Sequence, residues 1–172
     1  MLIVSGIPSR MKQRAILMSF LLLEPLASGR AQEVAAIDSD RGRHMASEAK
    51  GNFDIQIKPD ATSADGIGRF TIDKTFHGGI EGASTGAMVA VRTSTAGSAG
   101  YVLIEHVSGV VNGKSGGFML QHSGIMERGK PALTITVIPD SGTGDLTGIA
   151  GEMTIDAAAN HAYVLTYSLP AE

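Results

Sequence analysis

Hydrophobic and polar residues alternate along several short segments of this chain, and glycines and prolines separate the segments. The alternating or apolar segments are 53–57, 70–76, 80–91, 102–107, 118–121, 133–138, 146–155 and 163–167, and Gly148 and Gly151 interrupt the seventh. An alternation with a period of two is typical of strands that bury one face. Because the same region has no convincing amphipathic helical pattern, it predicts about eight strands.

Short strands joined by tight turns favour an antiparallel sandwich or barrel. A barrel of this size has an interior that is filled by side chains or holds one small ligand. We predict a single all-β domain, an antiparallel eight-stranded barrel, because Gly82, Gly86 and Gly116 lie inside the expected strands and suit the bends of a barrel. An open sandwich is the alternative.

The apolar arms on either side of Asn112-Gly113 predict a hairpin with a type I′ turn. Pairing outward from this turn puts Leu103 opposite His122. One face of the hairpin then holds the more apolar set of side chains: Tyr101, Leu103, Glu105, Val107, Phe118, Leu120 and His122. On that face Glu105 and His122 are diagonal neighbours within reach of each other. A bulge in either arm would shift the register and break the assignment.

Glu105 and His122 are the candidate catalytic pair. A carboxylate beside a histidine orients the imidazole and stabilises its charged form, which makes a proton-transfer pair. The alternative is a buried pair that only fixes the register of the hairpin. The side chains expected to contact a ligand are Tyr101, Phe118, Leu120, Phe70 and Lys74.

Lys74 is in step with Phe70, Ile72 and Phe76, so the alternation places it on the inward face. A turn at Gly78-Gly79 would then put Glu81 diagonal to it, and such a pair would make the barrel interior polar enough to orient a ligand. The alternative, which we favour, is a lysine at a strand end that lays its stem on apolar surface and keeps its head in water.

The composition excludes several classes of function. The formal net charge of −3 is not the basic balance of a nucleic-acid-binding protein. The chain has no cysteine, and none of its 5 histidines forms an H-x-H or H-x-x-x-H pair. We therefore expect no metal site and no cofactor.

The first part of the chain has the order of a secretory signal. Residues 11–14 are basic, residues 15–23 are apolar, and small residues follow around Gly29. The apolar run is too short to span a bilayer as a helix, which needs about 20 residues. We expect residues 1–31 to be a signal peptide or disordered leader, 32–48 a flexible linker and 49–172 the barrel domain. The protein is then periplasmic or secreted if the signal is used, and cytoplasmic otherwise.

Four segments of the body resemble one bacterial family. They are GRFTIDKTFHG (68–78), AGYV (99–102), GGFMLQHSG (116–124) and PDSGTGDLTGIAG (139–151). On these motifs the chain is similar to the bacterial domain of unknown function 3224, over about residues 49–169. The resemblance implies an eight-stranded barrel similar to that of allene oxide cyclase and the dirigent proteins. It implies no activity, because no catalytic motif of the cyclases can be matched here.

Two hypotheses of function follow. In the first, the barrel binds a small apolar or amphipathic molecule, or acts as a cofactor-free isomerase or cyclase, by analogy of fold alone. In the second, the barrel is a structural or interaction module that acts as a homo-oligomer. Its contact surface would be the outer face of the hairpin, with Val102, Ile104 and Met119.

Overall fold

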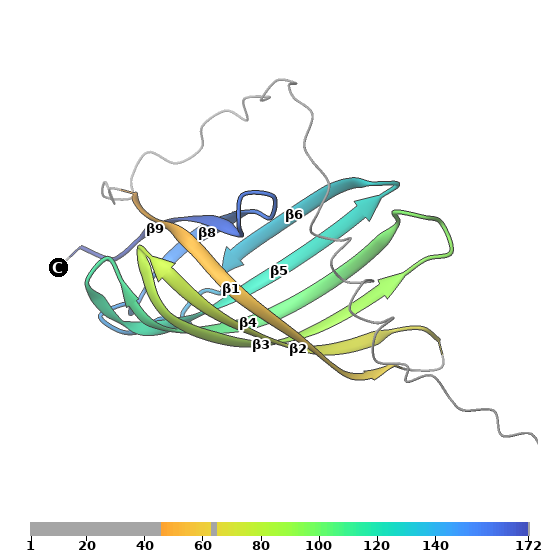
Figure 1. The fold of residues 1–172 in the computed structure, drawn as a ribbon. Helices are drawn as coiled ribbons and strands as arrows, with labels where there is room; N and C mark the ends of the chain where they lie inside the picture. The colour runs from red at the N-terminus through yellow and green to blue at the C-terminus, as the bar shows by residue number, and fades with distance from the viewer. Residues whose placement is uncertain (1–45, 63–64, 172) are drawn as a thin grey trace, which may run out of the picture.

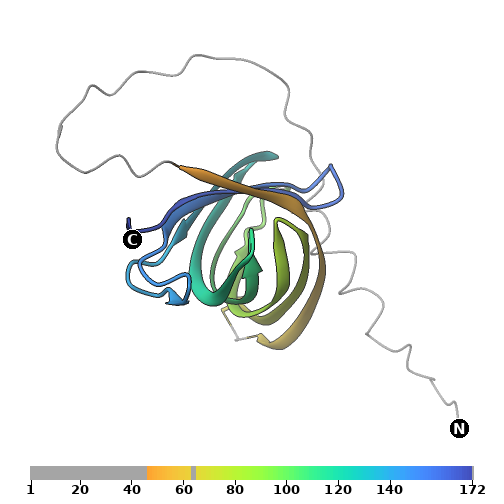
Figure 2. The ribbon, with the colours of Figure 1, turned by 90° about the vertical axis from the view of Figure 1, so that its left-hand side faces the viewer.

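Eight long antiparallel strands close into one barrel, and a ninth strand of two residues pairs with one of them. Figures 1 and 2 show the barrel from two sides. The computed structural model describes residues 46–62 and 65–171. The strands are β1 (Ser47–Thr62), β2 (Gly68–Gly78), β3 (Ile80–Arg92), β4 (Ala99–Val111), β5 (Lys114–Glu127), β6 (Lys130–Val137), β7 (Thr143–Gly144), β8 (Ala150–Asp156) and β9 (Ala162–Ser168). Each long strand pairs with the next, except that β6 pairs with β8, and β9 pairs with β1 to close the ring. The prediction of an eight-stranded antiparallel barrel is confirmed.

The β4–β5 hairpin has the predicted register. Asn112 and Gly113 have φ angles of 47° and 87°, the left-handed conformation that a type I′ turn requires at both central positions. Leu103 pairs with His122 and Glu105 with Leu120, without a bulge. The face of the hairpin that the sequence predicts to point inward therefore does point into the barrel.

Two local expectations need correction. Within the segment 146–155, only Ala150 onward forms a strand, because Leu146 and Ile149 instead turn inward and are buried in the core. Met119 is half-buried, not exposed. The chain that follows β6 bonds to the Met119 backbone, where Ile138 N donates to Met119 O (2.8 Å) and Met119 N donates to Ser141 Oγ (3.0 Å).

The two ends of the barrel differ. We call the end with the β2–β3 and β4–β5 turns, at the left in Figure 1, the packed end. Its inward-facing side chains form one buried cluster that includes Phe53, Phe76, Val107, Phe118 and Leu165. Tyr163 closes this end from inside, because its hydroxyl accepts from Ile80 N (2.7 Å) and lies 3.2 Å from the His77 carbonyl oxygen, to which it donates.

We call the other end, with the β3–β4 and β5–β6 connections, the solvated end. Ile57, Phe70, Ala90 and Tyr101 pack against the buried Ile72–Met88–Leu103 cluster but are only partly buried themselves. Leu133, in register with the inward-facing Gly124, is 42% exposed. Water therefore reaches apolar side chains that line the interior at this end.

The expected leader (1–31) and most of the expected linker (32–48) lie outside the described residues, and β1 begins at Ser47. In the part of the chain that the structure describes, no helix has the length and apolar character needed to cross a membrane.

Candidate functional site

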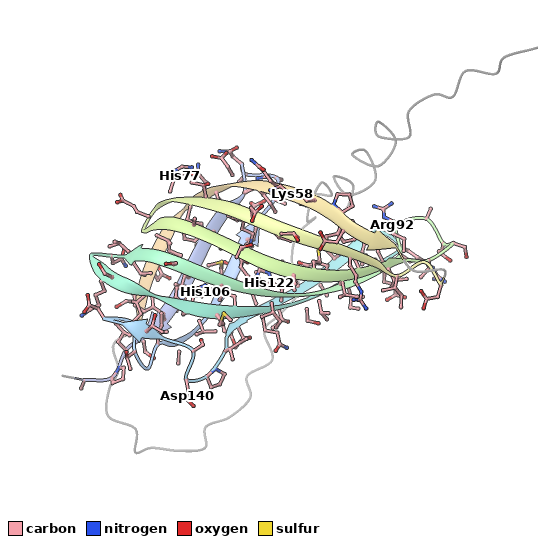
Figure 3. The ribbon with its side chains drawn as sticks, turned by 90° about the horizontal axis from the view of Figure 1, so that it is seen from below. Lys58, His77, Arg92, His106, His122 and Asp140 are labelled. Carbon is pink, nitrogen blue, oxygen red and sulfur yellow. The ribbon has the colours of Figure 1, made fainter. Side chains whose placement is uncertain are left out.

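Four polar side chains meet inside the barrel, between the packed end and the solvated end. They are Lys74, Ser84, Glu105 and His122, one each from β2, β3, β4 and β5, and each is at most 7% exposed. We call them the polar cluster. In Figure 3 His122 lies midway along the barrel, between His77 toward one end and Arg92 at the other.

Glu105 is the centre of the polar cluster. Lys74 Nζ lies 2.7 Å from Glu105 Oε2 in an ion pair. Ser84 Oγ donates a hydrogen bond to the other carboxylate oxygen, Oε1. His122 Nε2 also approaches Oε2, at 2.9 Å. Both oxygens of this buried carboxylate are therefore occupied, which offsets part of the cost of removing its charge from water.

The register explains how these side chains meet. Lys74 pairs with Ser84 across β2 and β3, so the two side chains point to the same side of the sheet. Glu105 pairs with Gly86, which has no side chain to occupy the interior beside it. The Lys74 ammonium also lies over the rings of Phe53 (4.7 Å to the centroid) and Phe76 (5.8 Å), whose electron-rich faces attract a cation.

His122 Nε2 is buried without a hydrogen-bond partner of good geometry. It lies 2.9 Å from Glu105 Oε2, which makes a close electrostatic contact with the carboxylate. A buried polar atom left in this state costs free energy.

Burial and neighbouring charges shift the pKa values of Glu105 and His122. Burial alone would raise the pKa of Glu105, but His122 and Lys74 outweigh it and lower the pKa to about 2. Burial, helped by the Lys74 charge, lowers the pKa of His122 against the opposing effect of Glu105. At neutral pH Glu105 is therefore a carboxylate and His122 a neutral imidazole.

Tyr101 lies between the polar cluster and the solvated end. Its ring packs directly on Gly124 of β5, where a Cβ atom would come within 2.1 Å of the ring. Gly124 thus allows the tyrosine to lie flat against the wall of the barrel. Burial, and then the negative charge of Glu105, raise the pKa of Tyr101 to about 12, so the hydroxyl keeps its proton at neutral pH.

The predicted site residues fall into three places. Glu105 and His122 face inward and approach within hydrogen-bond distance, as their register predicts. Tyr101 and Phe70 lie at the solvated end. Phe118 and Leu120 are fully buried in the packed cluster, away from that end.

The position of Lys74 differs from the arrangement favoured from the sequence, in which its head lies in water. Its head is not in water, because the side chain is buried and paired with Glu105. Glu81, the partner considered from the sequence, is exposed on the outer face of β3.

Ser84 was missed by the sequence reasoning. The alternation of β3 could have found it, since Ser84 is in step with Ile80 and Met88, which are also buried. No group of three or more histidine, cysteine, aspartate or glutamate side chains within 46–62 and 65–171 is arranged to hold a metal ion.

Comparisons with known proteins identify the family. The family described as protein of unknown function (DUF3224) matches residues 49–167. The chain is similar to a crystal structure of a protein with unknown function from the DUF3224 family of Shewanella oneidensis MR-1. The two share 38% sequence identity with a TM-score of 0.68, over 74% of this chain and 99% of that one. No curated protein matches the chain. The barrel described above therefore belongs to a member of the DUF3224 family.

Proposed function

We propose that the barrel binds a small apolar or amphipathic molecule at its solvated end, with the ligand's polar part directed toward the polar cluster. The observation that supports this is a buried set of charged and polar side chains below partly exposed, inward-facing apolar ones. Apolar residues of similar volume would often stabilise a core as well as a buried ion pair does. Binding of a ligand would explain why the barrel interior contains these polar side chains.

The polar cluster also has the chemistry for a cofactor-free isomerisation or cyclisation. A neutral His122 can accept a proton from a bound molecule, and Glu105 beside it stabilises the imidazolium that forms. The same imidazolium can return the proton at another position of the molecule. Protons and electrons then balance without a further reactant.

Binding is tested by fluorescence titration with N-phenylnaphthylamine, an uncharged amphipathic probe. Ala90→Phe fills the interior at the solvated end and should weaken binding by about tenfold or more, equivalent to about 1.4 kcal/mol. Ala87→Phe is the matched control, because Ala87 lies on the same strand but is exposed on the outer face. The proposal fails if the protein does not bind the probe, or if the two variants weaken binding equally.

A second candidate function is that of a homo-oligomeric module. The specific observation is a group of large apolar side chains on the outer face of β3, β4 and β5 that are 41–55% exposed: Val89, Val91, Val102, Ile104 and Ile125. Val89 and Val102 pair directly across two of these strands. We call this group the outer apolar face.

A further inference from the structure

We infer that the site at the solvated end selects uncharged amphipathic molecules over anionic ones, an inference that rests on the proposed function. The polar part of such a ligand would be a hydroxyl, a carbonyl or a similar neutral group.

The one cation of the polar cluster is already neutralised. Lys74 Nζ is paired with Glu105 Oε2 at 2.7 Å and lies over the Phe53 ring. An anionic ligand would therefore meet a carboxylate without gaining a free cation in the polar cluster. Since burying an unpaired charge is costly, a sulfonate or carboxylate should be disfavoured at this depth.

The side chains next to this ion pair are uncharged at neutral pH. The lowered pKa of His122 leaves its imidazole uncharged at neutral pH, with Nε2 2.9 Å from Glu105 Oε2. The Tyr101 hydroxyl keeps its proton, because its pKa is raised to about 12. Beside uncharged side chains and an ion pair that is already balanced, a neutral oxygen group is buried at less cost than a charged one.

Charged side chains at the rim act differently from those inside. Arg92 and Arg128 are exposed at the solvated end. Salt screens their attraction for an anion, because the Debye length at physiological ionic strength is only about 8 Å. Probe affinities measured at low and high salt therefore separate the attraction of these two arginines for an anion from the preference of the barrel interior for an uncharged ligand.

The test compares two probes that differ by one charged group. N-phenylnaphthylamine is uncharged, and anilinonaphthalene sulfonate has the same ring framework with an added sulfonate. The wild-type protein at high salt should bind the uncharged probe at least about tenfold more tightly. Glu105→Gln leaves Lys74 without its anion and should narrow or reverse this preference. Glu81→Gln removes a charge from the exposed outer face of the same barrel and should leave the preference unchanged.

The outcomes separate this inference from the proposed function. If the uncharged probe binds and Ala90→Phe weakens it, the proposed function stands. If the sulfonate then binds the wild type equally tightly at high salt, the selectivity is overturned. A preference that is the same in Glu105→Gln as in the wild type also overturns it. Should Glu105→Gln not fold, the wild-type ratio of the two affinities decides alone.

Discussion

Glu105 holds the polar cluster together, because its carboxylate contacts Lys74, Ser84 and His122. We predict that Glu105→Ala destabilises the fold by about 3–5 kcal/mol, since it leaves a buried ammonium without its anion. Urea denaturation followed by circular dichroism measures the loss. A loss below about 1 kcal/mol would show that the ion pair is not buried as described.

A variant in which the whole polar cluster is replaced is the matched comparison for Glu105→Ala. Replacing Glu105 and His122 alone would leave Lys74 buried and unpaired, so the lysine and the serine must change with them. The variant Lys74→Met, Ser84→Ala, Glu105→Leu, His122→Leu should recover most of the stability that Glu105→Ala loses. It should also lose any turnover or selectivity that depends on the polar cluster.

His122 should make the protein less stable as the pH falls. Because burial lowers the pKa of His122 below its ordinary value of 6.5, the unfolded chain takes up a proton where the folded chain does not. The contribution of His122 to the free energy of unfolding is fully present above pH 6.5. It is lost as the pH falls toward the lowered folded-state pKa. The contribution of Glu105 to stability is lost at lower pH, as the pH falls from the ordinary pKa of 4.5 toward the folded-state pKa of about 2.

The pH effect is measured as the urea midpoint between about pH 7.5 and about pH 5. The midpoint should fall with pH in the wild type and fall less in His122→Gln. His106→Gln is the control, since His106 is exposed on the outer face of β4. Equal slopes in the wild type and His122→Gln would contradict the assignment.

Among the elements, the β4–β5 turn connects parts of the barrel that are distant in sequence. Asn112 Nδ2 donates to Glu48 O (3.0 Å) and Tyr167 Oη (3.2 Å), which joins the hairpin to β1 and β9. We predict that Asn112→Gly keeps the turn but costs about 1–2 kcal/mol through these lost bonds. Asn112→Ala should cost about 1 kcal/mol more, because its positive φ strains any residue with a Cβ atom.

Arg128→Gly is the control for this turn prediction. Arg128 and Gly129 have φ angles of 48° and 86° in the β5–β6 turn, so the backbone is equivalent. The hydrogen bond to Ser98 Oγ comes from the Arg128 backbone amide and survives the substitution. If Asn112→Gly proved as mild as Arg128→Gly, the side-chain bonds of Asn112 would contribute little.

The elements also show which parts of the fold could be predicted. Asn112-Gly113 allows one turn type, and the pairing of Glu105 and His122 with their neighbours follows by counting outward. The partner of Lys74 could not be found this way, because Glu105 lies two strands away and meets it only across β3. Local alternation identifies an inward face but not which inward residues meet.

At the scale of the molecule, the outer apolar face should mediate association of two or more barrels. We predict that light scattering at tens of micromolar gives a multiple of the monomer mass. Val102→Lys combined with Ile104→Lys should give monomers, because buried charges oppose the contact. Thr166→Lys, at an exposed position of β9, is the control and should leave the mass unchanged. A wild-type monomer at this concentration would rule out the oligomeric candidate.

The pairing of β1 with β9 has a consequence for synthesis of the chain. Ser47 of β1 pairs in register with Tyr167 of β9, so the ring cannot close until the last strand has left the ribosome. At about 5–20 residues per second, β1 waits several seconds with one hydrogen-bonding edge open. An open edge is a template for pairing with other chains. A nascent chain that stops before β9 would keep two such edges, and we expect it to aggregate instead of forming a smaller barrel.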